Sequence, residues 1–294
     1  MSLLKPIYYT FFRPSLNKGI LYRFGFIFHT EKIHARRTFD QLLKFCQAFI
    51  EITGKRALCV TMTPENPKIK KEMNEEHIDE KEFLVRLKKL NEVADIGYHG
   101  HFWKSGSESF HDVRNQLKPD TSISEFRNEV ADQFEREVTW LRDLGFATTS
   151  YSGGWWLINP WILQLQKKYG IQYDFTFSQQ AWVKNNWAKE TMSKASIQFG
   201  EVFKSSDGNV IHTQTLMGCP NTGYPQDFVR ILNSSSTSNV NPVGMITTHD
   251  YNIDSDNDLK NATELILYLK KMPQVSFFSI ADLATTIVTK QIAD

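Results

Sequence analysis

The chain has 294 residues, of which 41% are hydrophobic, and its 34 basic and 33 acidic residues give a net charge of +1. This length suits one large α/β domain, and the balanced charge provides no basic footprint for binding nucleic acid. No apolar run approaches the roughly 20 residues of a membrane-spanning helix, and residues 1–13 lack the continuous apolar core of a signal peptide. The sequence has three cysteines, an odd number, at widely spaced positions: Cys46, Cys59 and Cys219. They suit structural thiols in a reducing, cytoplasmic setting.

Predicted strands and helices alternate along the chain after an irregular, aromatic N-terminal extension at residues 1–20. Short runs rich in apolar and aromatic residues predict strands at residues 21–28, 57–62, 94–98, 148–152, 171–177, 208–216, 244–248 and 275–278. Apolar residues three or four positions apart predict helices at residues 38–52, 81–90, 122–144, 160–169, 228–232 and 259–271, and Ser279 with Asp282 caps a last one. The Pro-containing stretch 63–76 and the Ser/Asn-rich stretch 233–241 predict loops.

This alternation of strands and helices predicts a parallel sheet, because parallel strands need crossover connections. Seven or eight strands in one chain favour a closed (β/α) barrel over an open, doubly wound sheet. The sequence shows no internal repeat and no linker, so we expect residues 1–294 to form one barrel domain.

Polar side chains gather directly after four of the predicted strands. In a (β/α) barrel the carboxyl ends of the strands meet at one mouth, where ligands bind. Histidines scattered at random over a surface would not fall at so many strand ends. The residues that we expect to converge are His29 and Glu31 after the first strand, His99 and His101 after the third, residues 151–156 after the fourth, and His249 and Asp250 near the C-terminus.

One carboxylate and two imidazoles at this mouth predict a metal site. Glu31, His99 and His101 provide a ligand set that catalytic zinc uses while a further position stays open to water. A metal bound there would lower the pKa of water and polarise a carbonyl group. The alternative interpretation is a group of solvated or hydrogen-bonded strand ends.

The remaining polar groups suggest acid–base chemistry beside the metal. His249 could act as the general acid that protonates a leaving amine or alkoxide. His29 or Asp250 could act as the base or as the residue that orients it. Together with the metal ligands, these roles predict a hydrolase of amides or esters.

Large aromatic residues at the predicted strand ends suggest a binding surface for a sugar. Aromatic faces pack against the C–H surfaces of sugar rings, and tryptophan also carries a hydrogen-bond donor. The alternative is that these rings belong to the core. The candidates for substrate binding are Tyr151, Trp103, Trp155 and Trp156.

Five segments, taken in order, resemble the motifs of the NodB-type polysaccharide deacetylases, carbohydrate esterase family 4. Together they cover most of the chain from Tyr22 onward, and the family fold is a distorted (β/α) barrel. The matching segments are Phe28-His-Thr-Glu31, Asp95-Ile-Gly-Tyr-His99, Ser152-Gly-Gly-Trp155, Gly170-Ile-Gln-Tyr-Asp174 and Ile246-Thr-Thr-His249.

The resemblance implies removal of an N- or O-acetyl group from a sugar or polysaccharide precursor, with a divalent metal such as zinc. By position, Glu31 matches the metal-binding acid, His99 the first metal histidine and His249 the general acid. A cytoplasmic enzyme of this kind would act in surface-polysaccharide synthesis, such as that of O-antigen or capsule, on a soluble acetylated precursor.

The sequence departs from the family pattern at the metal site. The family has paired aspartates in its first motif, and here His29 and Glu31 stand in their place. The second metal histidine of the family lies four residues after the first, where this chain has Trp103. His101 or His111 would therefore have to complete the site.

Later motifs depart as well, with Tyr151 in place of an arginine and Asp250 where a proline is common. Two rival functions are the alternatives to a deacetylase. The first rival is a non-catalytic glycan-binding barrel with an eroded metal site. The second is an amidohydrolase-type metal hydrolase, a class that also uses an H-x-H pair. That class places the pair after its first strand, whereas His99 and His101 follow the third predicted strand here.

Overall fold

A computed structural model describes residues 15–103, 127–180, 183–218, 225–236, 240–286, 288 and 290–292. Most of the expected N-terminal extension lies outside the described residues, as do the helix start expected at 122–125, His111 and Cys219. Within the described part of the chain, no helix is long and apolar enough to cross a membrane.

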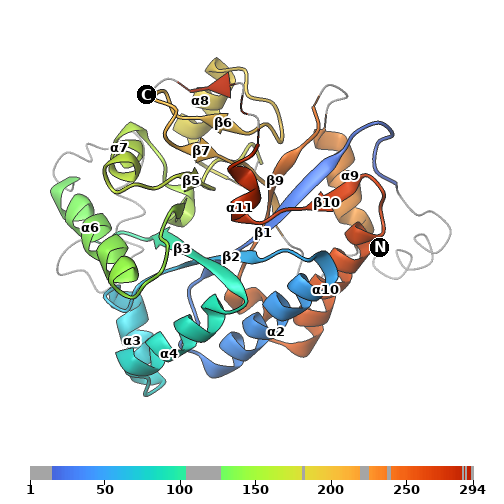
Figure 1. Cartoon of the computed structure of the whole chain (residues 1–294). Coiled ribbons are helices and arrows are strands. Elements are labelled where there is room, and N and C mark those ends of the chain that lie inside the picture. The colour runs from blue at the N-terminus through green and yellow to red at the C-terminus, as the bar shows by residue number, and fades with distance from the viewer. Residues whose placement is uncertain are drawn as a thin grey trace.

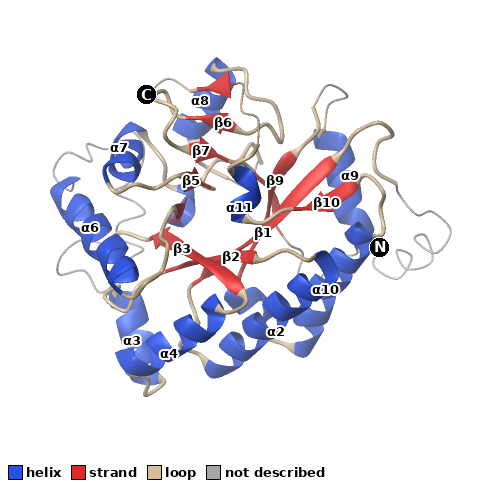
Figure 2. Ribbon diagram, in the orientation of Figure 1, coloured by secondary structure: helices blue, strands red, loops and turns tan. Residues whose placement is uncertain are grey.

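The centre of the molecule is one curled sheet, seen as the red arrows of Figure 2. Its strand order is β11-β6-β7-β5-β4-β3-β2-β1-β9-β8, with β10 paired to β1, and every ladder is parallel except β6–β7. The strands are β1 Tyr22–Thr30, β2 Ala57–Thr61, β3 Ala94–Gly100, β4 Ser150–Gly153, β5 Tyr173–Asp174, β6 Phe203–Lys204, β7 Ile211–His212, β8 Thr215–Gly218, β9 Val243–His249, β10 Val275–Phe277 and β11 Lys290–Gln291.

Most helices lie around the outer side of the sheet, whereas the short helix Ile280–Leu283 lies in the middle of the ring of strands (Figure 1). The α-helices are α2 Arg36–Thr53, α3 Pro67–Glu75, α4 Glu80–Asn91, α6 Arg127–Asp143, α7 Pro160–Lys168, α8 Asn186–Lys194, α9 Pro225–Ser235, α10 Asp256–Lys270 and α11 Ile280–Leu283. Two short 3₁₀ helices, η3 Gly154–Trp156 and η4 Asp250–Ile253, directly follow β4 and β9.

The stretch from β7 to β8 closes the curled sheet into a distorted barrel. At one end the Ile211 N–H donates to the Gln172 carbonyl at 2.8 Å, while β8 pairs with β9. Between them the Thr215 N–H donates to the Phe177 carbonyl at 2.9 Å. Eight neighbouring parallel strands, from β7 through β5, β4, β3, β2, β1 and β9 to β8, make the barrel wall. The predicted (β/α) barrel is therefore confirmed.

The two faces of β1 explain both the core and the site. Phe26 faces outward and packs against Phe45 of α2, with ring centroids 4.7 Å apart. Ile27 faces the inside of the barrel, in a buried cluster with Leu58 and Met245. Because side chains alternate along a strand, residue 29 also faces inward, at the carboxyl end where β1 leaves the sheet.

Several elements differ from those expected. The stretch 63–76, expected to be a loop, contains α3, because Asn66 caps a helix that starts at Pro67. The single strand expected at 208–216 is two strands, β7 and β8, separated by Thr213 and Gln214. Helix α8 was not expected, and α9 extends into the loop expected at 233–241.

Candidate metal centre

The carboxyl ends of β1, β3, β4 and β9 bring four side chains to the same mouth of the barrel. In the β1–β9 ladder His29 lies opposite His249, and in the β3–β4 ladder His99 lies opposite Ser152. The rings of His29 and His99 stack with their centroids 4.5 Å apart, so the two ladders meet inside the barrel. The convergence that we expected from the sequence is thus seen for these histidines.

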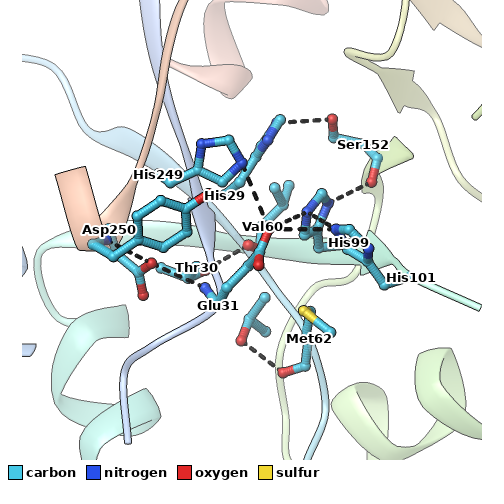
Figure 3. Close-up of polar contacts among 12 residues, drawn as sticks. His29, Thr30, Glu31, Val60, Met62, His99, His101, Ser152, His249 and Asp250 are labelled. Atoms are coloured by element: carbon cyan, nitrogen blue, oxygen red, sulfur yellow. Dashed lines mark hydrogen bonds and ion pairs between the residues drawn. The ribbon is translucent and has the colours of Figure 1, made fainter. Parts of the chain in front are cut away.

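Glu31, His99 and His101 form the buried centre of this cluster (Figure 3). His99 Nδ1 lies 2.8 Å from the Ser152 carbonyl oxygen, so Nδ1–H donates there and the Nε2 lone pair faces the cluster. His101 Nε2 is 2.9 Å from His99 Nε2, and Glu31 Oε1 is 3.4 Å from the former and 3.7 Å from the latter. Tetrahedral zinc with bonds of about 2.1 Å would separate its ligand atoms by roughly 3.4 Å. These three side chains could therefore hold a metal ion.

The charge states of Glu31 and His101 suit metal ligation. Burial alone would raise the pKa of Glu31, but hydrogen bonds and charges from His101 and His99 hold that pKa well below its ordinary value. Burial, together with the neighbouring His99, lowers the pKa of His101 to about 4 against the pull of Glu31. At neutral pH a carboxylate thus faces neutral imidazole, the forms in which these groups bind metals.

His249 is the histidine of this cluster that reaches solvent. Its side chain is 34% exposed, and its Nε2 lies 3.5 Å from Glu31 Oε1. The ring stacks on Tyr251 with centroids 4.8 Å apart. Burial lowers the pKa of His249 to about 4, so its imidazole is neutral at pH 7 and able to accept a proton.

His29 lies next to the cluster of Glu31, His99 and His101 and is 4% exposed. Its Nε2 is 3.1 Å from the Ser152 hydroxyl, and its ring meets that of His249 edge to face at 5.1 Å. Burial, reinforced by the rings of His99 and His249, places the pKa of His29 well below its ordinary value. These contacts show His29 packing the site from inside, and its role as a base stays a prediction.

Asp250 holds the loop that carries Glu31. Its carboxylate accepts hydrogen bonds from the backbone N–H groups of Glu31 at 3.1 Å, Lys32 at 2.6 Å and Tyr251 at 2.9 Å. The side chain is fully buried, and burial raises its pKa to about 7 despite these hydrogen bonds. Asp250 therefore orients the backbone of Glu31, and its role as the base or as the residue that orients the base stays a prediction.

No protein-family profile matches the chain, and no curated protein matches it either. Solved structures do match. A 4-α-glucanotransferase from Thermococcus litoralis gives a TM-score of 0.58 at 11% identity over 93% of this chain and 42% of that one. A candidate polysaccharide deacetylase from Mycobacterium smegmatis gives 0.55 at 12% identity, covering 93% of both chains. This protein has the NodB-type deacetylase fold.

The NodB-type fold does not by itself decide the reaction. A Puue allantoinase also matches, with a TM-score of 0.52 and 13% identity over 94% of both chains. The three structures share one architecture but are named for different activities. This chain also spans less than half of the glucanotransferase. The function must therefore be argued from the residues at the barrel mouth.

The residues that follow β4 form a strained turn against the site. Trp155 and Trp156 have φ of 50° and 63°, the left-handed region that bulky residues rarely adopt. The Trp155 ring stands edge to face on His101 at 4.9 Å, and Trp156 lies 5.6 Å from His29. Both indoles are half-buried, so they contact the cluster and keep part of their surface in solvent.

The other two aromatic candidates lie differently. Tyr151 is fully buried on the outward face of β4, where its ring lies 5.6 Å from both Tyr98 and Phe134. Its neighbour in sequence, Ser152, faces the site instead because side chains alternate. Trp103 is half-buried against the core, and its backbone exchanges two hydrogen bonds with Gln133. Roles in substrate binding for Tyr151 and Trp103 stay predictions.

The sequence analysis missed Lys68 and Asn66 at the start of α3. Lys68 Nζ lies 2.8 Å from Glu31 Oε2, and the Asn66 side-chain amide donates to the His101 carbonyl at 3.0 Å. The signal that could have located them is the Asn66-Pro67 pair, a helix start of the same form as Asn159 followed by Pro160.

Proposed function

We propose that this protein is a metal-dependent deacetylase that removes an N- or O-acetyl group from a sugar or polysaccharide precursor. The observation that carries the proposal is the buried convergence of Glu31, His99 and His101 beside the solvent-reaching His249. The candidate polysaccharide deacetylase that matches over 93% of this chain supports the same reaction class. Surface-polysaccharide synthesis in the cytoplasm, of O-antigen or capsule, is the setting that we propose.

Glu31, His99 and His101 would hold the metal, and two imidazoles with one carboxylate favour zinc among divalent ions. When bound, zinc supplies Lewis-acid activation of water and of the acetyl carbonyl. Ser152 fixes the His99 ring by accepting its Nδ1–H. That hydrogen bond leaves Nε2 as the ligating nitrogen, an arrangement that metal-binding histidines share.

His249 would move the proton in this reaction. Its Nε2 is close to the proposed metal ligand Glu31, its side chain reaches solvent, and its lowered pKa leaves it neutral at pH 7. A neutral imidazole can take a proton from water during attack and deliver it to the leaving amine or alkoxide. Asp250 assists by holding the backbone of Glu31.

The substrate would lie against the half-buried aromatic rings beside the cluster. Trp155 and Trp156 contact His101 and His29 from the η3 turn, and Tyr251 stacks on His249. These rings could face the apolar surface of a sugar while the acetyl group enters the metal centre. An acetylated sugar or glycan is accordingly the substrate class that we propose.

The test combines metal content with acetate release by untagged protein. We expect about one zinc ion per chain and release of acetate from acetylated amino sugars or sugar esters by the wild type. His99→Ala should lose both properties, while His77→Asn, which replaces an exposed histidine, should keep both. If the wild type takes up no metal even after incubation with zinc, the metal-dependent reaction is wrong.

The second candidate is a glycan-binding barrel without catalysis. It is favoured by His29 and Trp103, which stand where the family has an aspartate and its second metal histidine. It predicts that acetylated and deacetylated glycans bind and that neither zinc nor His249 is needed for binding. Calorimetric titration of glycan into wild type and His249→Asn, with and without zinc, separates the two candidates.

A further inference from the structure

We propose that Lys68 is a positioning residue that holds Glu31 with one carboxylate oxygen turned to the histidines, and thereby sets the strength and geometry of metal binding. The inference rests on the proposed function in taking Glu31 as a metal ligand. It adds a residue that comes from helix α3 rather than from a strand end.

The two carboxylate oxygens of Glu31 have separate partners. Oε2 accepts a hydrogen bond from the Lys68 ammonium at 2.8 Å. Oε1 faces the Nε2 atoms of His101, His249 and His99 at 3.4, 3.5 and 3.7 Å. Because Lys68 occupies Oε2, Glu31 presents a single oxygen to the metal site.

The Lys68–Glu31 pair is shielded from water. The side chain of Glu31 is 6% exposed and that of Lys68 is 24% exposed. A charge-assisted hydrogen bond in such surroundings is stronger and more strictly oriented than an exposed ion pair. Replacing Lys68 by a neutral residue would leave a buried carboxylate free to rotate or to bind a metal through both oxygens.

The first turn of α3 fixes Lys68 and reaches the second ligand segment as well. The Asn66 side chain caps the helix by accepting the Lys68 N–H at 3.0 Å. The same side chain donates from its amide to the His101 carbonyl at 3.0 Å. One helix turn therefore contacts Glu31 through Lys68 and His101 through Asn66. Through Asn66, the backbone of Lys68 is therefore linked to His101, in the same cluster in which the Lys68 ammonium contacts Glu31.

Lys68→Met removes the charge but keeps an unbranched side chain, and Lys68→Arg keeps the charge. Lys71→Met is the matched control, because Lys71 is exposed on the same helix. Zinc affinity of each metal-free protein is measured by competition with a chelator. Coordination geometry is read from the visible absorption spectrum of the cobalt-loaded protein.

We expect Lys68→Met to weaken zinc binding about 10–100-fold, as loss of a partner to a metal ligand does, and to change the cobalt spectrum. Lys68→Arg should bind zinc more tightly than Lys68→Met, and Lys71→Met should match the wild type in both measurements. If Lys68→Met does not fold, Lys68→Gln replaces it with the same expectation.

A Lys68→Met protein with wild-type zinc affinity and cobalt spectrum overturns the positioning role while the proposed function stands. Loss of zinc affinity that Lys71→Met shares equally also overturns it, because the loss would then follow from surface charge. A wild-type protein that binds neither ion overturns the proposed function together with this inference.

Discussion

The backbone of Gly154 lies directly against the imidazole of His101. A Cβ on residue 154 would come within 2.5 Å of the Cδ2, Cγ and Nδ1 atoms of that ring, closer than real Cβ contacts. Gly154 does not need a left-handed φ, so the close approach to His101 is what requires glycine. The turn after β4 therefore limits where a proposed metal ligand can lie.

Gly154→Ala should displace His101 and weaken zinc binding at least about tenfold, because a ligating side chain moved from its place loses its metal. The added methyl group should also destabilise the protein by about 1–3 kcal/mol, as overpacking does. Chelator competition and urea unfolding measure the two effects. Gly218→Ala is the control, since a Cβ there meets nothing within 4 Å. Equal zinc affinity in both variants would show that His101 is not held by this contact.

Asp250→Ala should destabilise the protein and loosen Glu31, because backbone N–H groups at Glu31 and Lys32 lose their acceptor. An unsatisfied buried donor costs about 1–3 kcal/mol. We expect a loss of that order in the free energy of unfolding, measured in urea, and weaker zinc binding. Asp254→Ala, at an exposed position on the same connection, should change neither. A loss of stability with unchanged zinc affinity would limit Asp250 to folding.

The sequence was sufficient to predict the barrel and the proposed metal ligands because both depend on short-range periodicity. Strand ends at Glu31, His99 and His249 can be read from where apolar runs stop, and parallel strands bring such ends to one mouth. The H-x-H spacing also predicted that the side chains of His99 and His101 lie on the same side of the strand end. The helix expected at residues 160–169 is likewise confirmed as α7, which Asn159 caps.

What the sequence could not supply are contacts set by tertiary packing. Tyr151 was expected at the mouth, but the pleat of β4 turns it to the helix side and turns Ser152 to the site. The left-handed backbone of Trp155 follows from no propensity of tryptophan. Lys68 was missed because the charged composition of 63–76 hid the helix that places its ammonium on Glu31.

Glu137 of α6 should make stability fall as pH rises. It is buried and accepts hydrogen bonds from the hydroxyls of Thr63 at 2.6 Å and Tyr98 at 2.5 Å. Burial raises the pKa of Glu137 to about 7 from 4.5 despite these hydrogen bonds. The folded protein thus holds a proton that the unfolded chain releases above pH 4.5, and this stabilisation disappears as pH rises through about 7.

We expect the wild type to lose about 2 kcal/mol of unfolding free energy from this group between roughly pH 5.5 and 8. Glu137→Gln, which stays neutral, should lack that part of the pH dependence in urea unfolding. Glu135→Gln changes an exposed neighbour on the same helix and should follow the wild type. Parallel pH profiles for all three proteins would show that Glu137 ionises equally in the folded and unfolded states.

His249→Asn should slow deacetylation strongly without emptying the metal site. His249 is outside the Glu31, His99 and His101 ligand set, although its Nε2 lies 3.5 Å from Glu31 Oε1. Loss of a general acid–base group lowers kcat by about 10²–10⁴-fold. We therefore expect wild-type zinc content with kcat reduced on that scale, measured by acetate release. His77→Asn is the control, because His77 is exposed and asparagine tolerates its φ of 54°. Loss of zinc in His249→Asn would instead make His249 a fourth metal ligand.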